Sequence, residues 1–185
     1  YKKFKTVLGM DNYTIKKLIK QGINNLEELL DAFSSGKFID GLTPIQRAGL
    51  LYYKDFSKEL NKNILTEIKQ KLSVICKKLY DIGELRQHKT PIGKVEYLCV
   101  VNSITDMEPL QHLLMATPYF NEKIKQKGNH IDFIFKTEHG QNVRVFIKFI
   151  LKKHLQVELF LNTGKDFVSS IKRIAYKNNI SIRAD

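Results

Sequence analysis

The spacing of apolar residues along the chain changes once, close to Gly83, and this change limits which folds the chain can adopt. Before Gly83, apolar residues such as Ile64, Ile68 and Leu72 recur every three or four positions, which is typical of amphipathic helices. After Gly83, short apolar or alternating runs such as residues 131–135 favour strands. We therefore expect an α+β chain. A helical part covers residues 1–82, and a mixed sheet with flanking helices covers residues 83–185.

Capping and turn residues place the boundaries of these elements. Thr43 followed by Pro44 is a typical helix start, and residues 138–142 supply hairpin-turn side chains. The lysine-rich segment 123–127 is expected to be an exposed turn. Helices are expected over residues 14–20, 26–33, 44–60, 64–79, 109–115 and 166–177, and strands over residues 95–101, 131–135, 143–150 and 155–161.

The charge balance favours a polyanionic partner. Lys and Arg number 31 against 19 Asp and Glu, which gives a formal net charge of +12. Such an excess suits nucleic acid first and an acidic membrane surface second, while the alternative is a basic surface that simply faces water. The sequence contains no apolar run near the roughly 20 residues that span a bilayer, so we expect a soluble intracellular protein without membrane contact. Cys76 and Cys99 have apolar neighbours and are expected to be core thiols in a reducing compartment.

The first motif is a glycine-containing loop before a short helix and a turn. Its string Val-Leu-Gly9-Met-Asp11, followed by a helix and by Gly22-Ile-Asn-Asn-Leu-Glu-Glu-Leu, resembles a helix-hairpin-helix. In that motif, backbone amides at a helix N-terminus hold a DNA phosphate. Asp11 replaces the usual second glycine, and the nearby lysines can offset its charge. A plain two-helix connector is the alternative. The DNA-binding residues that the resemblance implies are Gly9, Asn12, Thr14, Lys16 and Lys17.

The second motif is the helix of residues 42–56, Leu-Thr-Pro-Ile-Gln-Arg-Ala-Gly-Leu-Leu-Tyr-Tyr-Lys-Asp-Phe. It closely resembles the helix that follows the helix-hairpin-helix in family X DNA polymerases, the DNA polymerase beta-like enzymes. The two motifs cover the first third of the chain. The resemblance implies a helical fingers-like part followed by a nucleotidyltransferase palm.

The third motif lies at residues 82–98 and resembles the palm of the same family with its functional groups altered. Gly83 and Arg86 match the segment that binds the incoming triphosphate, while Glu84 replaces a Ser and Gln87 replaces a second Arg. Lys94 replaces the first of two aspartates that bind both magnesium ions. Glu96 keeps a carboxylate at the second position. Two-metal chemistry needs these carboxylates, because the ions stabilise the attacking and the leaving oxygen.

The remaining parts of the site are expected further along the chain. Glu158, within Gln-Val-Glu-Leu, resembles the third carboxylate on its strand, and Thr163-Gly164 resemble the turn that lines the nucleotide sugar. The resemblance thus implies remnant catalytic positions at Glu96, Glu158 and Lys94. It implies a remnant nucleotide site at Gly83, Arg86, Thr163 and Gly164.

Three functions follow from this altered site. The first is a catalytically impaired polymerase-like module that binds duplex or primer-template DNA, or docks onto another replication or repair protein, without a cofactor. In this case Lys94 is expected to pair with Glu96 or Glu158. The second is an active, divergent nucleotidyltransferase that uses magnesium with Glu96 and Glu158. The third is a protein-interaction scaffold with no nucleic-acid role.

Overall fold

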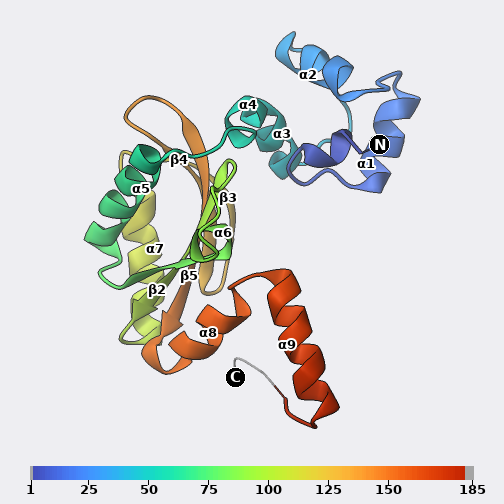
Figure 1. The fold of residues 1–185 in the computed structure, drawn as a ribbon. Coiled ribbons are helices and arrows are strands. Elements are labelled where there is room, and N and C mark those ends of the chain that lie inside the picture. The colour runs from blue at the N-terminus through green and yellow to red at the C-terminus, as the bar shows by residue number, and fades with distance from the viewer. Residues whose placement is uncertain (1, 182–185) are drawn as a thin grey trace. The chain divides into compact units, whose positions relative to one another are not determined.

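The computed structural model describes residues 2–181, and the chain divides into two compact units between Phe56 and Ser57 (Figure 1). The sequence placed the boundary at residues 82 and 83, where the period changes. The difference arises because helix α5 (Lys62–Ile75) packs on the sheet of the second unit. Its buried residues Ile64, Ile68 and Leu72 join the core of that sheet, so the helix belongs to the unit whose strands it covers.

The first unit is helical, as expected. It contains a 3-10 turn at Phe4–Thr6, then α1 (Asn12–Lys20), α2 (Leu26–Ser34), α3 (Pro44–Leu51) and α4 (Tyr53–Phe56). Asp11, Asn25 and Thr43 cap α1, α2 and α3 through their side-chain oxygens. Thr43 and Gln46 form a reciprocal capping box.

Gln46 and Gly49 of α3 hold the loop before α1 in place. The Gln46 side chain is 2% exposed, and its amide nitrogen donates to the carbonyl of Gly9 (2.9 Å) and to the hydroxyl of Thr14 (3.0 Å). Its amide oxygen accepts from the backbone N–H of Thr43 (2.9 Å). A Cβ atom at Gly49 would lie 2.9 Å from backbone atoms of Leu8, so the loop backbone touches the helix where α3 has no side chain.

The second unit is built on a five-stranded mixed sheet of order β1-β2-β5-β4-β3. The strands β2 and β5 are parallel, and every other neighbouring pair is antiparallel. The sheet and its helices make this unit α+β, in agreement with the sequence. The strands are β1 (Leu79–Ile82), β2 (Lys94–Val101), β3 (Phe120–Lys127), β4 (His130–Lys136) and β5 (Asn142–Leu151).

The two faces of this sheet differ. One face carries Val95, Tyr97, Phe133, Val145 and Ile147, which pack with α5 and α7 (Met107–Met115) into the main core (Figure 1). The other face carries a smaller apolar cluster at one end. That cluster consists of Ile82, Leu98, Ile150 and Leu159, the last from α8 (Leu155–Leu161). Glu96 is the register partner of Ile82 and Lys148 that of Leu98, so charged side chains of the second face lie beside this cluster.

Residues 155–161 form a helix, so the predicted strand there is wrong. The chain leaves β5 at Leu151, makes a 3-10 turn at Lys152–His154, and enters α8. Leu155 and Leu159 lie four residues apart, on one face of the helix, and both pack against the smaller apolar cluster. The helix α9 (Lys165–Lys177) follows, close to the predicted range.

Residues 123–127 form part of β3, so the predicted turn is also wrong. Lys123, Lys125 and Lys127 pair with residues of β4 in antiparallel register. The register shifts between Phe120 and Glu122 and again between Lys123 and Lys125. The strand β1 was not expected either, because the sequence continued the preceding helix to residue 79. Both strands lie at the edges of the sheet.

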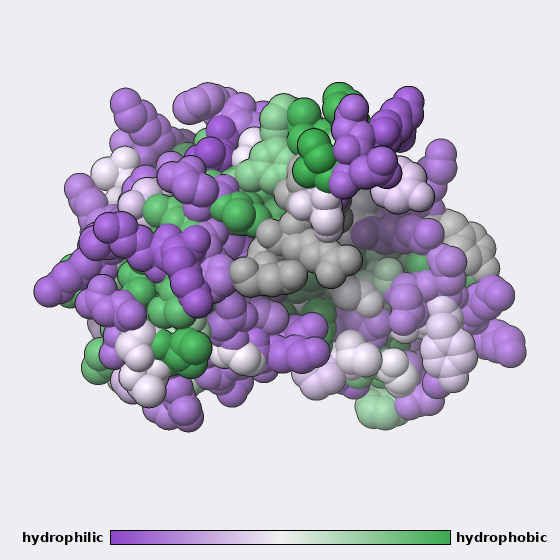
Figure 2. Space-filling view, turned by 90° about the horizontal axis from the view of Figure 1, so that it is seen from below, coloured by the Kyte–Doolittle hydropathy of each residue, from purple (hydrophilic) through white to green (hydrophobic). Residues whose placement is uncertain are grey.

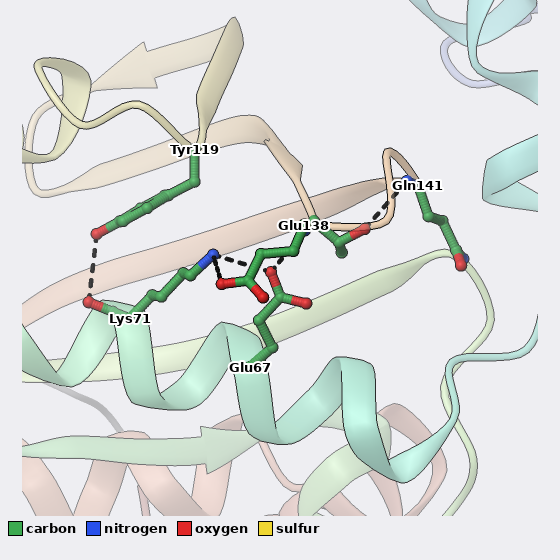
Figure 3. Close-up of polar contacts among 6 residues, drawn as sticks. Glu67, Lys71, Tyr119, Glu138 and Gln141 are labelled. Atoms are coloured by element: carbon green, nitrogen blue, oxygen red, sulfur yellow. Dashed lines mark hydrogen bonds and ion pairs between the residues drawn. The ribbon is translucent and has the colours of Figure 1, made fainter.

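An ion-pair network joins α5 to the hairpin between β4 and β5, as Figure 3 shows. The ammonium of Lys71 lies 3.0 Å from carboxylate oxygens of both Glu67 and Glu138. Glu67 also accepts a hydrogen bond from the backbone N–H of Glu138 (2.8 Å), and the hydroxyl of Tyr119 donates to the carbonyl of Lys71 (3.3 Å). The hairpin is therefore fixed to the helix that covers the sheet.

None of the helices within residues 2–181 has the length and apolar content to cross a membrane. On the face drawn in Figure 2, outside its grey atoms, hydrophilic residues predominate and hydrophobic residues form separate groups.

Candidate functional site

Three carboxylate–cation pairs lie on the second face of the sheet, where the sequence predicted remnants of a metal site. The ammonium of Lys94 lies 2.8 Å from Glu96 on the same strand, and that of Lys148 lies 2.7 Å from Glu158. The guanidinium of Arg144 donates to Asp132 through Nε at 2.9 Å. In each of these three pairs, the carboxylate is therefore neutralised by a cation of the chain itself.

Glu96 and Lys94 are partly exposed and form the first pair. Their side chains are 31% and 34% exposed, so solvent screens the attraction between them. The other carboxylate oxygen of Glu96 lies so close to Gly83 that a Cβ atom at this position would collide with it. Gly83 also has a φ of +62°, which glycine adopts without the usual steric cost. The structure therefore brings Gly83, Lys94 and Glu96 together, and Lys94 pairs with Glu96 as expected.

Phe146 occupies the position on β5 that faces Glu96, and the sequence reading missed it. The two residues are Cα partners in the parallel pairing of β2 with β5, so their side chains share a face. The ammonium of Lys94 lies 5.6 Å from the centre of the Phe146 ring, within the range of a cation–π contact. The available signal was the alternation of residues 143–150, in which Phe146 stands between Arg144 and Lys148 at a polar position.

Glu158 lies on α8 and not on a strand, which corrects its predicted placement. Its carboxylate is buried, at 5% exposure, and receives hydrogen bonds from Lys148 (2.7 Å) and from the side-chain amide of Asn162 (3.0 Å). The buried carboxylate of Glu158 and the partly exposed ammonium of Lys148 (28% exposed) thus link α8 to β5, and removing the cation would leave a buried charge without its partner. Glu158 therefore has a structural role that does not require a metal ion.

The predicted nucleotide-site residues do meet. The guanidinium of Arg86 donates to the hydroxyl of Thr163 (3.0 Å), and the backbone N–H of Gly83 donates to the carbonyl of Asn162 (2.7 Å). The side-chain amide of Gln87 donates to the carbonyl of Thr163, and a Cβ atom at Gly164 would collide with that amide. The short helix α6 (Gly83–Arg86) is thus held against the turn between α8 and α9 by direct contacts.

An open pocket of about 670 Å³ lies beside this contact. Three acidic side chains and one lysine contribute to its wall, which opposes the entry of a triphosphate. The charged residues that line it are Glu84, Lys89, Glu96 and Asp166, and Gly83, Gln87 and Gly164 line it as well.

The residues present do not fit a two-metal centre. Of the carboxylates that the family resemblance assigned to metal ions, Glu96 contacts Lys94 and Glu158 contacts Lys148, while Phe146 stands on the strand beside Glu96. Within residues 2–181, no three His, Cys, Asp or Glu side chains lie close enough together to hold a metal ion.

In the first unit, Asp11 occupies the N-terminus of α1, where a phosphate was expected. Its carboxylate accepts from the backbone N–H of Thr14 (2.7 Å), and this hydrogen bond lowers the pKa of Asp11 below its usual value. Thr14 itself is 4% exposed, and its hydroxyl accepts from Gln46. The amide of Thr14 and an acceptor site of its hydroxyl are therefore engaged inside the unit, while its contact with DNA stays a prediction.

The other predicted DNA-binding residues divide into buried and exposed groups. Gly9 has a φ of +74°, and a Cβ atom there would lie 2.8 Å from the Ile45 side chain, so the loop requires glycine for its own packing. Lys17 is partly buried, and its ammonium lies 4.8 Å from the centre of the Tyr13 ring. Asn12 and Lys16 are exposed, and so is Lys20 on the same helix, which was not among the predicted residues. These exposed side chains remain available for a phosphate backbone.

A scan of the chain against models of protein families finds no match, and no curated protein matches its sequence at a significant level. The case for a function accordingly rests on the motifs and on the geometry of the two sites.

Proposed function

We propose that this chain is a catalytically impaired module similar to family X DNA polymerases, which binds DNA or docks within a replication or repair assembly. The motif of residues 42–56 and the spacing of Gly83, Arg86 and Glu96 support the family. The basic composition, with a net charge of +12, supports a nucleic-acid partner.

The pairing of Lys94 with Glu96 is the main observation in support of lost nucleotidyltransferase activity. A divalent ion at Glu96 would have to approach or displace the Lys94 ammonium, which lies 2.8 Å from the carboxylate. At about 5 Å and an effective dielectric constant of about 20, a unit charge and a dication repel by roughly 6 to 7 kcal/mol before screening. Phe146, which faces Glu96 on β5, supplies no metal ligand.

Metal binding and primer extension test the impaired chemistry. We expect the natural chain to bind neither Mg²⁺ nor Mn²⁺ in calorimetry and to add no nucleotide to a primer. The double variant Lys94→Asp/Phe146→Asp removes the cation and places a carboxylate opposite Glu96, so it should gain Mn²⁺ binding. Magnesium-dependent extension by the natural chain, abolished by Glu96→Gln, would establish the active alternative instead.

Duplex binding tests the role of the first unit. The exposed lysines of α1 are expected to contact phosphates, so Lys16→Glu/Lys20→Glu should weaken duplex affinity at least tenfold and reduce its salt dependence. The matched control is Lys172→Glu/Arg173→Glu on α9, which changes the net charge by the same amount at exposed positions. Equal losses in both variants would show that the chain attracts DNA only through its overall charge.

A further inference from the structure

The strands β3, β4 and β5 together carry a basic and aromatic surface that the proposed DNA contact through α1 does not use. The antiparallel pairings place Lys127, His130 and Lys148 in one row across the three strands. They place Lys125, Asp132 and Phe146 in the next row. Residues paired across neighbouring strands project from the same face, so these side chains form one surface. We call Lys125, Lys127, His130 and Phe146 the strand-edge surface.

The helices α5, α7 and α8 pack elsewhere. The residues of α5 and α7 join the core on the opposite face of the sheet, and α8 packs on the apolar cluster with Ile82, Leu98 and Ile150. Lys125 and Lys127 are exposed, while His130 and Phe146 are partly exposed. The surface therefore presents both its cations and part of its rings to solvent within this unit.

Two rings stand next to each other on the strand-edge surface. The centres of the His130 and Phe146 rings lie 5.6 Å apart with planes inclined by 36°, which is within the range of aromatic pairs. The ammonium of Lys94 lies 5.6 Å from the Phe146 ring. Rings held by a sheet lose little freedom when a flat ligand stacks on them, which favours binding.

The charge of this surface is positive. Asp132, its one acidic neighbour in the two rows, is bound by Arg144. Among the described residues, neither Lys125 nor Lys127 forms an ion pair that offsets its charge. Burial and the charges of Lys125, Lys148 and Lys127 lower the pKa of His130, which is a second sign of positive potential. The ligand that fits is anionic and carries flat rings.

We propose that the strand-edge surface binds single-stranded nucleic acid, with bases stacking on Phe146 and His130 and phosphates lying against Lys125 and Lys127. Proteins that bind single strands without sequence preference generally combine aromatic side chains, on which the bases stack, with cations that contact the phosphates. The inference rests on the proposed nucleic-acid role of the chain. It uses a different surface from the lysines of α1 and a different form of the ligand.

Binding of a fluorescein-labelled oligothymidine of about 15 nucleotides, followed by anisotropy, tests the proposal. Lys125→Glu/Lys127→Glu should weaken binding at least tenfold and lower the slope of log K against log salt by about 1.4, the value for two phosphate contacts on a single strand. The charge-matched control Lys172→Glu/Arg173→Glu should bind nearly as the natural chain does. Equal effects of the two variants would overturn the proposal.

The ring itself is tested by a pair of substitutions. Phe146→Leu keeps an apolar side chain but removes the stacking surface and should weaken oligothymidine binding about tenfold, whereas Phe146→Tyr should retain it. Thermal unfolding of both variants checks that the sheet is intact. If Phe146→Leu binds as well as the natural chain, or if polyglutamate competes as well as oligothymidine, the surface holds acidic chains in general and the proposal is wrong.

A DNA duplex measured in parallel separates the two proposals. If both hold, Lys16→Glu/Lys20→Glu lowers duplex affinity, and Lys125→Glu/Lys127→Glu lowers single-strand affinity. Loss of only the first effect contradicts the role of α1, and loss of only the second contradicts the strand-edge surface. A natural chain that binds neither form contradicts both.

Discussion

At the scale of single residues, Lys94 and Phe146 change what the sheet face can do. Lys94 holds the position at which the family resemblance implies an aspartate, Phe146 is the register partner of Glu96, and the Lys94 ammonium lies 5.6 Å from the centre of the Phe146 ring. Lys94 was readable from the sequence because it interrupts a motif with fixed spacing. Phe146 was not, because only the parallel register of β2 with β5 shows which residue faces Glu96.

Replacing Gln46 should destabilise the first unit. Gln46→Ala leaves the carbonyl of Gly9, the hydroxyl of Thr14 and the amide of Thr43 without their buried partner. We expect a loss of about 2 to 4 kcal/mol in the free energy of unfolding, measured by urea denaturation. The exposed Gln70→Ala serves as the control and should change stability by less than about 0.5 kcal/mol. A similar small effect at Gln46 would mean that water replaces its hydrogen bonds.

His130 should make stability depend on pH just below neutrality. Burial and the lysines at 125, 148 and 127 lower its pKa, and Asp132 only partly opposes them. As the pH falls below the value of about 6.5 of the unfolded chain, the unfolded state binds the proton more readily, so the free energy of unfolding decreases. His130→Asn should remove this part of the decrease in denaturation curves between about pH 7 and pH 5. The exposed His139→Asn should leave it unchanged.

At the scale of elements, the sequence predicted those whose pattern is strong by itself. The helices α1, α2 and α5 have capping residues and a regular apolar face, and β4 and β5 are dense in buried apolar residues. Residues 155–161 are a short apolar run, which fits a strand or a buried helix equally well until the packing of Leu155 and Leu159 is known. Six of the eight residues of β3 are polar, three of them lysines, so only its pairing with β4 reveals the strand.

The network of Lys71 should contribute to holding the hairpin on α5. Lys71→Met removes two contacts of 3.0 Å to carboxylates and is expected to cost about 1 to 2 kcal/mol of unfolding free energy. Lys69→Met removes a single ion pair, with Asp81, that is more exposed to solvent. This substitution should cost less than about 1 kcal/mol of unfolding free energy. If both substitutions lower the unfolding free energy equally, the Lys71 network stabilises the unit no more than a single surface ion pair does.

The same network has a pH signature. Burial opposes the charge of Lys71, but the hydrogen bonds and charges of Glu138 and Glu67 outweigh it and raise its pKa. Its contribution is therefore complete below the unfolded value of about 10.4 and is lost as the pH rises through the higher folded value. The difference in unfolding free energy between the natural chain and Lys71→Met should shrink above about pH 10.4.

At the scale of the whole molecule, two separate cores imply two folding units. The apolar cluster of the first unit and the cores of the sheet share no residue. The sequence placed the change from helices to strands at residue 83, whereas β1 already begins at Leu79, and it could not show which unit the long helix α5 joins. A helix with one apolar face can pack on either neighbour, and only the buried positions of Ile64, Ile68 and Leu72 decide it.

Two fragments test this division. Residues 57–185 should fold cooperatively, as judged by thermal unfolding and by dispersed NMR spectra. Residues 83–185 should not, because they lack α5, β1 and the core contacts of Ile64, Ile68 and Leu72. Burial of those three side chains is worth on the order of 6 kcal/mol, comparable with the total stability of a small domain. A cooperatively folded 83–185 fragment would restore the boundary at residue 83.

The lysines of β3 have a consequence for the behaviour of the protein at high concentration. Because β3 ends the sheet, its outer backbone groups could pair with a strand of another molecule and begin aggregation. Exposed Lys123, Lys125 and Lys127 make two such strands repel each other. A polyanion that neutralises these charges removes the repulsion. Light scattering should therefore rise as oligothymidine is titrated toward the point of charge balance.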